Sequence, residues 1–126
     1  STATYLGAHP GRAYAIGGPA AAADPAASAT VGVDRYATAA AVATKFFSAP
    51  TIVGFATGSN FPDALAGGSL LAKEGAPLLL ATAAGLSTPT ATYLTSVRSS
   101  VVTAQLFGGD TVISGTASTA ITNALN

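Results

Sequence analysis

The 126-residue chain has no cysteine, methionine or tryptophan, and it carries few charges. The lack of cysteine excludes disulfides, thiol chemistry and thiolate-bound zinc or iron–sulfur clusters. Charged residues make up 8% of the chain, against roughly 25% in typical soluble domains. Five basic residues balance five acidic ones without forming a basic cluster. This argues against nucleic acid as a partner, because phosphate binding draws its affinity from several cations.

Long apolar runs and processing signals are missing as well. Although 49% of the residues are hydrophobic, no apolar stretch reaches the roughly 18 residues needed to span a bilayer. No membrane partner is therefore predicted. The length fits one domain with one core. Because the chain shows neither an initiator methionine nor a signal peptide, we interpret it as a processed piece of a longer protein.

What the chain does contain is an internal repeat. Residues 2–6, Thr-Ala-Thr-Tyr-Leu, recur unchanged as residues 90–94. A short apolar run that ends in a glycine pair follows each copy, with Gly17 and Gly18 in the first and Gly108 and Gly109 in the second. Self-similarity of this kind is typical of tandem repeats.

The repeat sets the expected domain organisation. The pentapeptides lie 88 residues apart and the glycine pairs 91, so the copies differ by an insertion of three residues. Residues 1–29 are predicted to be the tail of a preceding repeat, and residues 30–126 one full following repeat. We expect the tail to pack with the following unit in a single structural domain.

Helical and strand patterns alternate through the full unit. Asp34 and Thr88 are the expected helix caps, and Gly75 is the expected helix end. Gly67 and Gly68 would let a helix lie close to a sheet. The order predicts an α/β domain with a mostly parallel sheet flanked by helices, and residues 1–29 echo its last third as helix, strand, helix. The expected elements are helices over 35–49, 62–73, 88–97 and 116–125, and strands over 51–56, 77–82 and 102–107.

Four motifs in this unit, in this order and spacing, point to a family. They are Val-Gly-Val-Asp-Arg-Tyr-Ala-Thr-Ala at 31–39, Ala-Thr-Gly-Ser-Asn-Phe-Pro-Asp-Ala-Leu-Ala-Gly-Gly at 56–68, Gly-Ala-Pro-Leu-Leu-Leu at 75–80, and Leu-Phe-Gly-Gly at 106–109 with Val-Ile-Ser at 112–114. The sequence closely resembles the cell wall-binding repeat type 2. That family occurs, usually as three tandem repeats, in surface proteins and cell-wall amidases of Gram-positive bacteria.

The resemblance implies a fold, a function and a location. The implied fold is a Toprim-like or Rossmann-like α/β domain, and the repeats associate as a triangular trimer. The implied function is non-covalent anchoring of a secreted protein to an anionic secondary polymer of the cell wall. Since this chain holds one full unit, neighbouring repeats or a homotrimer are the expected partners. A neutral, hydrogen-bonded glycan stays open as the ligand, because the unit has few cations.

Within the motifs, seven residues are interpreted as structural. Asp34 is expected to cap its helix, and Asp63 to lie in the first turn of the next one. Phe61 is read as a plug over the core, with stacking on a sugar as the alternative. The glycine pair has two readings, a tight turn or close approach of a ligand. The structural set is Asp34, Thr38, Phe61, Pro62, Asp63, Gly108 and Gly109.

Three residues are candidates for polymer binding. Ser59 and Asn60 lie between a strand and a helix, where open α/β sheets bind ligands, and the following helix start suits an anion. Arg35 is expected either to form a structural ion pair with Asp63 or another acid, or to contact the polymer directly.

Catalytic and metal-binding patterns are scarce, so no enzyme activity and no cofactor are predicted. His9 is the only histidine, and no partnered serine and aspartate accompany it. Toprim enzymes hold Mg²⁺ with a glutamate and an Asp-x-Asp pair, but this chain has no such pair and Glu74 is its only glutamate. The main hypothesis is a non-catalytic cell-wall module. The alternative is a structural or self-assembly domain whose ligand site exists only in the full array, and a small hydrolase ranks below both.

Overall fold

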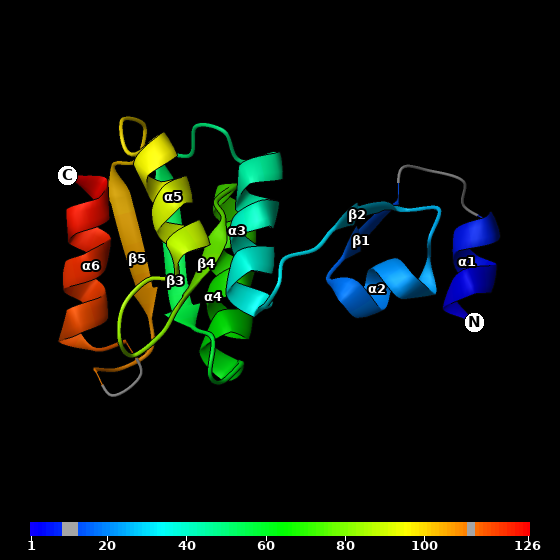
Figure 1. Ribbon diagram of the computed structural model, residues 1–126, viewed down its shortest axis with the longest axis horizontal. Coiled ribbons are helices and arrows are strands. Elements are labelled where there is room, and N and C mark those ends of the chain that lie inside the picture. Colours follow the sequence, from blue (N-terminus) through cyan, green and yellow to red (C-terminus); the bar gives the residue numbers. More distant parts are fainter. Residues whose placement is uncertain (9–12, 111–112) are drawn as a thin grey trace.

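Helices and strands alternate along the whole chain in the computed structural model, which describes residues 1–8, 13–110 and 113–126. Figure 1 shows their arrangement. The elements are α1 (Thr2–Ala8), β1 (Tyr14–Ile16), α2 (Gly18–Ala23), β2 (Ser28–Thr30), α3 (Arg35–Phe46), β3 (Ile52–Thr57), α4 (Pro62–Glu74), β4 (Leu78–Ala81), α5 (Thr88–Val97), β5 (Thr103–Phe107) and α6 (Gly115–Leu125).

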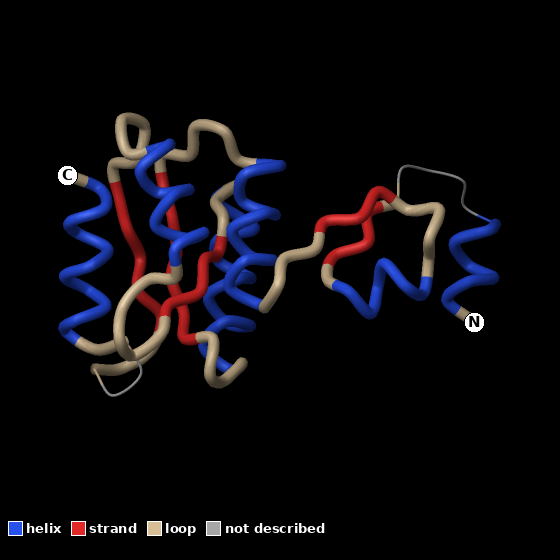
Figure 2. The backbone as a smooth tube through the Cα atoms, viewed as in Figure 1, coloured by secondary structure: helices blue, strands red, loops and turns tan. Residues whose placement is uncertain are grey.

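Both sheets in the described residues are parallel, which confirms the predicted α/β class. The larger sheet has the order β4-β3-β5, with Phe55 of β3 between Leu79 of β4 and Leu106 of β5. The smaller sheet pairs β1 with β2, so that Ala15 lies beside Ala29. Each strand pair is joined through helices, as parallel pairing requires (Figure 2).

Helices cover the two faces of the larger sheet unequally (Figure 1). The helix α4 packs against β3 on one face, while α3 and α5 pack together over the other, with α6 beside α5. The main core fills the space between the sheet and the second group of helices. Its buried members are Ala43, Val53, Phe55, Leu79, Ala81, Tyr93, Leu94, Val97, Ile113, Ala117 and Ile121.

Glycine lets α4 lie directly on the sheet. A Cβ atom on Gly67 would lie 2.5 Å from the ring of Phe107, and one on Gly54 would lie 2.2 Å from Leu71 Cδ1. Real Cβ atoms essentially never approach other atoms so closely, so a larger residue at either position would have to displace the side chain that it meets. Gly68, in contrast, has its nearest neighbour, Leu78 Cδ2, at 3.7 Å. Close helix packing is therefore confirmed at Gly67 and not at Gly68.

Residues 1–8 and 13–30 lie to one side of the larger sheet and its helices (Figure 1). The contact between the two parts centres on Lys45 of α3. Its Nζ donates to Ser28 Oγ at 2.9 Å and to Thr30 Oγ1 at 3.1 Å, and lies 4.8 Å from the Tyr14 ring centre. The Tyr14 ring also meets the Phe46 ring edge to face, with 5.0 Å between centres. Polar and aromatic contacts together thus join the N-terminal segment to α3.

Most of the predicted element order is confirmed, with two corrections. Asp34 caps α3, and Gly75 ends α4 with a left-handed φ of 66°. The cap of α5 is Ser87, not Thr88: its side chain accepts from the Thr90 N–H, which places Thr88 inside the helix. The strand β2 was not predicted, because Ser-Ala-Thr lacks the run of β-branched and aromatic residues that marks a strand.

Alanine substitutions at the two adjacent glycines of α4 should have opposite effects. Alanine favours a helix interior over glycine by about 1 kcal/mol, which Gly68→Ala should gain because it has room. Gly67→Ala should instead lower the free energy of unfolding by about 1–3 kcal/mol, since its Cβ would strike the Phe107 ring. Urea unfolding of both variants measures the two values. Equal effects would contradict the close packing of α4 at Gly67.

The buried phenol of Tyr93 predicts a loss of stability at high pH. Its hydroxyl donates to the Phe47 carbonyl at 2.8 Å, and burial raises its pKa from 10.0 to about 12. Because the folded state favours the neutral phenol, this contribution is complete below pH 10 and is lost as the pH rises through 12. At neutral pH, Tyr93→Phe should cost about 1 kcal/mol through the lost hydrogen bond.

The same pair of proteins tests the pH dependence. The difference in unfolding free energy between the original chain and Tyr93→Phe should shrink between pH 10 and 12, because only the original chain loses the benefit of the neutral phenol. Urea unfolding at pH 8, 10 and 12 measures it. A difference that stays constant over this range would show that the phenol titrates alike in both states.

Candidate functional site

A corner stabilised by hydrogen bonds leads from β2 into α3. Asp34 Oδ1 accepts from the Ala37 N–H at 2.8 Å, which caps the helix as predicted. The hydroxyl of Thr38 accepts from the Gly32 N–H at 3.0 Å and donates to the Asp34 carbonyl at 2.9 Å. A Cβ on Gly32 would lie 2.4 Å from the backbone of Ala37 and Thr38. These contacts fix the place where Arg35 leaves the backbone.

Arg35 lies against the end of β3. Its Nη1 donates to the Gly58 carbonyl at 2.7 Å, and the ring of the next residue, Tyr36, packs on the Gly58 Cα so closely that a Cβ there would lie 2.4 Å from it. The expected ion pair with Asp63 does not form, and among the described residues Arg35 has no carboxylate partner. Asp63 sits in the first turn of α4, where the helix dipole stabilises a carboxylate without a cation.

The loop after β3 is held by its own polar groups. The Ser59 N–H donates to Thr57 Oγ1 at 3.1 Å, and the Phe61 N–H donates to Asn60 Oδ1 at 3.0 Å. Both Ser59 and Asn60 are exposed, so the Ser59 hydroxyl and the Asn60 amide nitrogen face solvent. The loop therefore presents hydrogen-bonding groups on a backbone that is already fixed.

The start of α4 differs from the prediction in one respect. Phe61 occupies the N-cap position without a side-chain cap, and Pro62 follows in the first turn as expected. Phe61 is 70% exposed, so it does not plug the core. The buried aromatic residue of β3 is Phe55, while the Phe61 ring lies on the surface.

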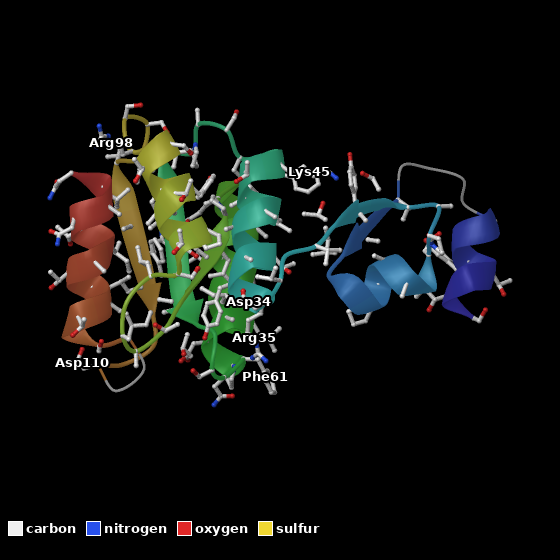
Figure 3. The ribbon with its side chains drawn as sticks, in the orientation of Figure 1. Asp34, Arg35, Lys45, Phe61, Arg98 and Asp110 are labelled. Atoms are coloured by element: carbon white, nitrogen blue, oxygen red, sulfur yellow. The ribbon has the colours of Figure 1, made fainter. Side chains whose placement is uncertain are left out.

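Arg35 and Phe61 meet at a pocket of about 180 Å³ at the carboxyl end of β3. Figure 3 shows Asp34, Arg35 and Phe61 at this end of the sheet, while Lys45 and Arg98 lie at the opposite end. The three predicted binding residues thus come together, and Phe61 joins them. The pocket is lined by Arg35, Thr57, Gly58, Ser59, Asn60, Phe61, Ala64 and Leu80.

A second, larger cleft of about 630 Å³ separates the N-terminal segment from α3, and Arg35 lies at its border too. Its walls are mostly apolar. This cleft was not predicted, because it forms only where residues 16–19 and residues 31–42 come together in the folded chain. Its lining is Ile16, Gly17, Gly18, Pro19, Val31, Gly32, Val33, Asp34, Arg35, Thr38, Ala39, Val42 and Leu78.

The glycine pairs lie at strand ends, and neither pair is among the residues that line the smaller pocket. Gly17 after β1 has a φ of 87° and Gly108 after β5 a φ of 123°, a backbone region that favours glycine. Gly109 has open space around it. The positive φ at Gly17 and Gly108 fits a tight turn, and Gly17 and Gly18 also line the larger cleft, so both interpretations stay predictions.

His9 lies outside the described residues, as does Val112 of the fourth motif. Within the described part of the chain, no three histidine, cysteine, aspartate or glutamate side chains come together as metal ligands would. None of the helices there is both long enough and apolar enough to cross a membrane.

Comparison with known families identifies the chain. The model of the family described as cell wall binding domain 2 (CWB2) matches residues 30–118, which is most of the sequence. The chain therefore belongs to the CWB2 family and is a cell-wall-binding module. The match begins at residue 30, where the predicted full repeat also begins, and ends at residue 118, before the predicted end at residue 126. No curated protein sequence matches the chain.

One solved structure shares the fold. The chain is similar to Cwp8 from Clostridium difficile, with a TM-score of 0.71 at 16% sequence identity. The match covers 88% of this chain and 20% of the Cwp8 chain, so the present chain spans about a fifth of the length of that protein. At this identity the likeness supports the α/β fold.

Replacing Gly58 by alanine should disrupt the site from beneath. The new Cβ would strike the Tyr36 ring, so we expect a loss of about 1–3 kcal/mol in unfolding free energy and a displaced Tyr36. Gly109→Ala is the matched control, because nothing lies within 4 Å of its Cβ position, and it should change stability by less than about 0.5 kcal/mol. Thermal unfolding and the NMR shifts of the Tyr36 ring report the two effects. A stable Gly58→Ala variant with unchanged Tyr36 shifts would contradict the contact.

Proposed function

We propose that the chain is a non-catalytic module that anchors a secreted surface protein, non-covalently, to a secondary cell-wall polymer of a Gram-positive bacterium. The observation that carries the proposal is the pocket at the end of β3, where Arg35, Ser59, Asn60 and Phe61 are all exposed around one hollow. Membership of the CWB2 family supports the cell wall as the location.

Arg35 supports an acidic group on the polymer. A guanidinium has five N–H donors, and the Gly58 carbonyl accepts only from Nη1, so further donors are left for a ligand. The bond to a neutral carbonyl orients the side chain without cancelling its charge. Such a planar, oriented fork suits a phosphate or carboxylate.

The other three residues support a sugar backbone. The Phe61 ring is 70% exposed, and an aromatic face of this kind packs well on the apolar face of a sugar ring. The Ser59 hydroxyl and the Asn60 amide can hydrogen-bond to sugar hydroxyls beside it. An apolar surface with a few placed polar groups is typical of small-ligand sites.

The pocket also supports a binding role without chemistry. Thr57 and Ser59 bring hydroxyl groups to its lining, but the lining has no histidine and no carboxylate that could act as a general base. No cofactor is proposed.

A structural or self-assembly role is the second candidate. It is favoured by the apolar cleft of about 630 Å³ beside α3, which is a surface that a neighbouring repeat would cover. In that case the repeats form the triangular trimer, from one chain or as a homotrimer of three, and polymer binds only to the full array.

Phe61 provides the sharpest test of the polymer site. Phe61→Ala should weaken binding to purified cell walls about tenfold, equivalent to about 1.4 kcal/mol, because the stacking surface is lost while the exposed ring adds little to stability. Val102→Ala is the matched control, since Val102 is 84% exposed but lies before β5, at the opposite end of the sheet. Co-sedimentation with cell walls measures both affinities.

The same assay distinguishes the polymer from the rest of the wall. Extraction of the secondary polymer should abolish co-sedimentation of the original chain. Equal binding to stripped peptidoglycan, or equal affinity of Phe61→Ala and Val102→Ala, would contradict the proposed site. Absence of all binding together with self-association in light scattering would favour the second candidate.

A further inference from the structure

The strand β5 forms an edge of the larger sheet. Its Thr103 N–H donates to the Thr51 carbonyl at 3.1 Å, so the backbone groups of Thr103 point toward β3. These groups alternate in direction along a strand, which turns those of Ala104 and Leu106 away from β3. No strand in the described part of the chain pairs with this side of β5. An open row of donors and acceptors is a template for another strand.

The internal repeat maps β1 onto β5. Alignment of the glycine pairs places Gly17 on Gly108, and therefore Ala15 on Leu106. The backbone agrees with this alignment, because the glycine that ends each strand has a positive φ. The strand that pairs with β1 therefore indicates which kind of strand would pair with β5.

The partner of β1 is β2, and its contacts define a register. The Ser28 N–H donates to the Ala13 carbonyl at 3.0 Å, and the Gly17 N–H donates to the Thr30 carbonyl at 2.9 Å. The counterparts of Ala13 and Gly17 are Ala104 and Gly108. The direction of the backbone groups alternates along β5, and those of Thr103 point toward β3. The backbone groups of Ala104 and Gly108 therefore point toward the open side of β5. Two independent observations, the repeat and the hydrogen bonds to β3, therefore agree.

We infer that the open edge of β5 binds a parallel strand of the β2 type from the following repeat, with Leu106 opposite the counterpart of Ala29. The complete sheet then has four strands in the order β4-β3-β5-β2, the last contributed by the next repeat. In the same way, β1 of this chain corresponds to the β5 strand of the preceding repeat, and β2 is the strand that completes the preceding repeat's sheet. Each repeat completes the sheet of the one before it.

The path of the chain is compatible with this pairing. Figure 1 shows the C-terminus beside the end of β5 where that strand begins, which is where a parallel neighbour must also begin. Residues 24–27 connect α2 to β2, so four residues suffice to pass from the helix to the strand in the first copy. A second copy of this chain is the less suitable donor, since its own β2 is already paired with β1 and its Thr30 is buried.

Hydrogen exchange on an extended chain tests the inference. A copy of residues 24–34 is appended after Asn126, which supplies the four-residue connection and the strand. In the original chain the Gly17 amide should exchange slowly and the Gly108 amide fast. In the extended chain the amides of Leu106 and Gly108 should slow by at least about tenfold, because each gains an acceptor. Size-exclusion chromatography at the same dilution should show a monomer.

A matched control carries Thr30→Pro in the appended copy, which removes a donor from the new strand and should abolish the protection. Unchanged exchange at Leu106 and Gly108 in the extended chain would overturn the inference, as would equal protection with the proline control. Protection that appears in the original chain and grows with concentration would overturn the assignment to a following repeat in favour of a second copy. This experiment contains no polymer. A negative result would therefore not bear on the polymer-binding proposal, which the co-sedimentation assay tests separately.

Discussion

Close approach between backbone and side chains, at positions where no Cβ is present, is the constraint on which this structure depends. At Gly54 and Gly67 the sheet and α4 touch through a leucine and a phenylalanine side chain that any larger residue would displace. Layers this close leave little room for long side chains between them. The abundance of small residues thus follows from the close packing of the layers.

The same constraint builds the site. Gly58 accepts the Tyr36 ring against its Cα and the Arg35 guanidinium at its carbonyl, so one residue positions α3 against the end of β3. The chain has only five basic residues, so few cations are available to bind an acidic ligand. Lys45 lies over the Tyr14 ring and bonds to hydroxyls at the junction with the N-terminal segment. Arg35, in contrast, is held by a neutral carbonyl beside a hollow surface, which keeps its charge available to a ligand.

The sequence predicted the parts of the fold that local chemistry determines. Asp34 as a cap, Gly75 as a left-handed helix end and Gly67 as a close contact all follow from properties of single residues. The strand β2 could not be found this way, because Ser-Ala-Thr is stabilised by its pairing with β1 rather than by its own propensity. The role of Phe61 was predicted wrongly for a similar reason: the exposure of its ring depends on how the sheet and helices assemble, which composition does not report.

The expected repeat boundary after residue 29 falls inside the strand β2. Sequence repeats are counted from motif to motif, whereas strands belong to the sheet that pairs with them. Here β2 pairs back to β1, and α3, which begins five residues after Thr30, packs forward onto α5 and β4. Residues 31–34 therefore join two sheets, and Arg35 is the first residue beyond the joint. If each repeat completes the sheet before it, one short segment connects that completed sheet to Arg35 and the pocket at the end of β3.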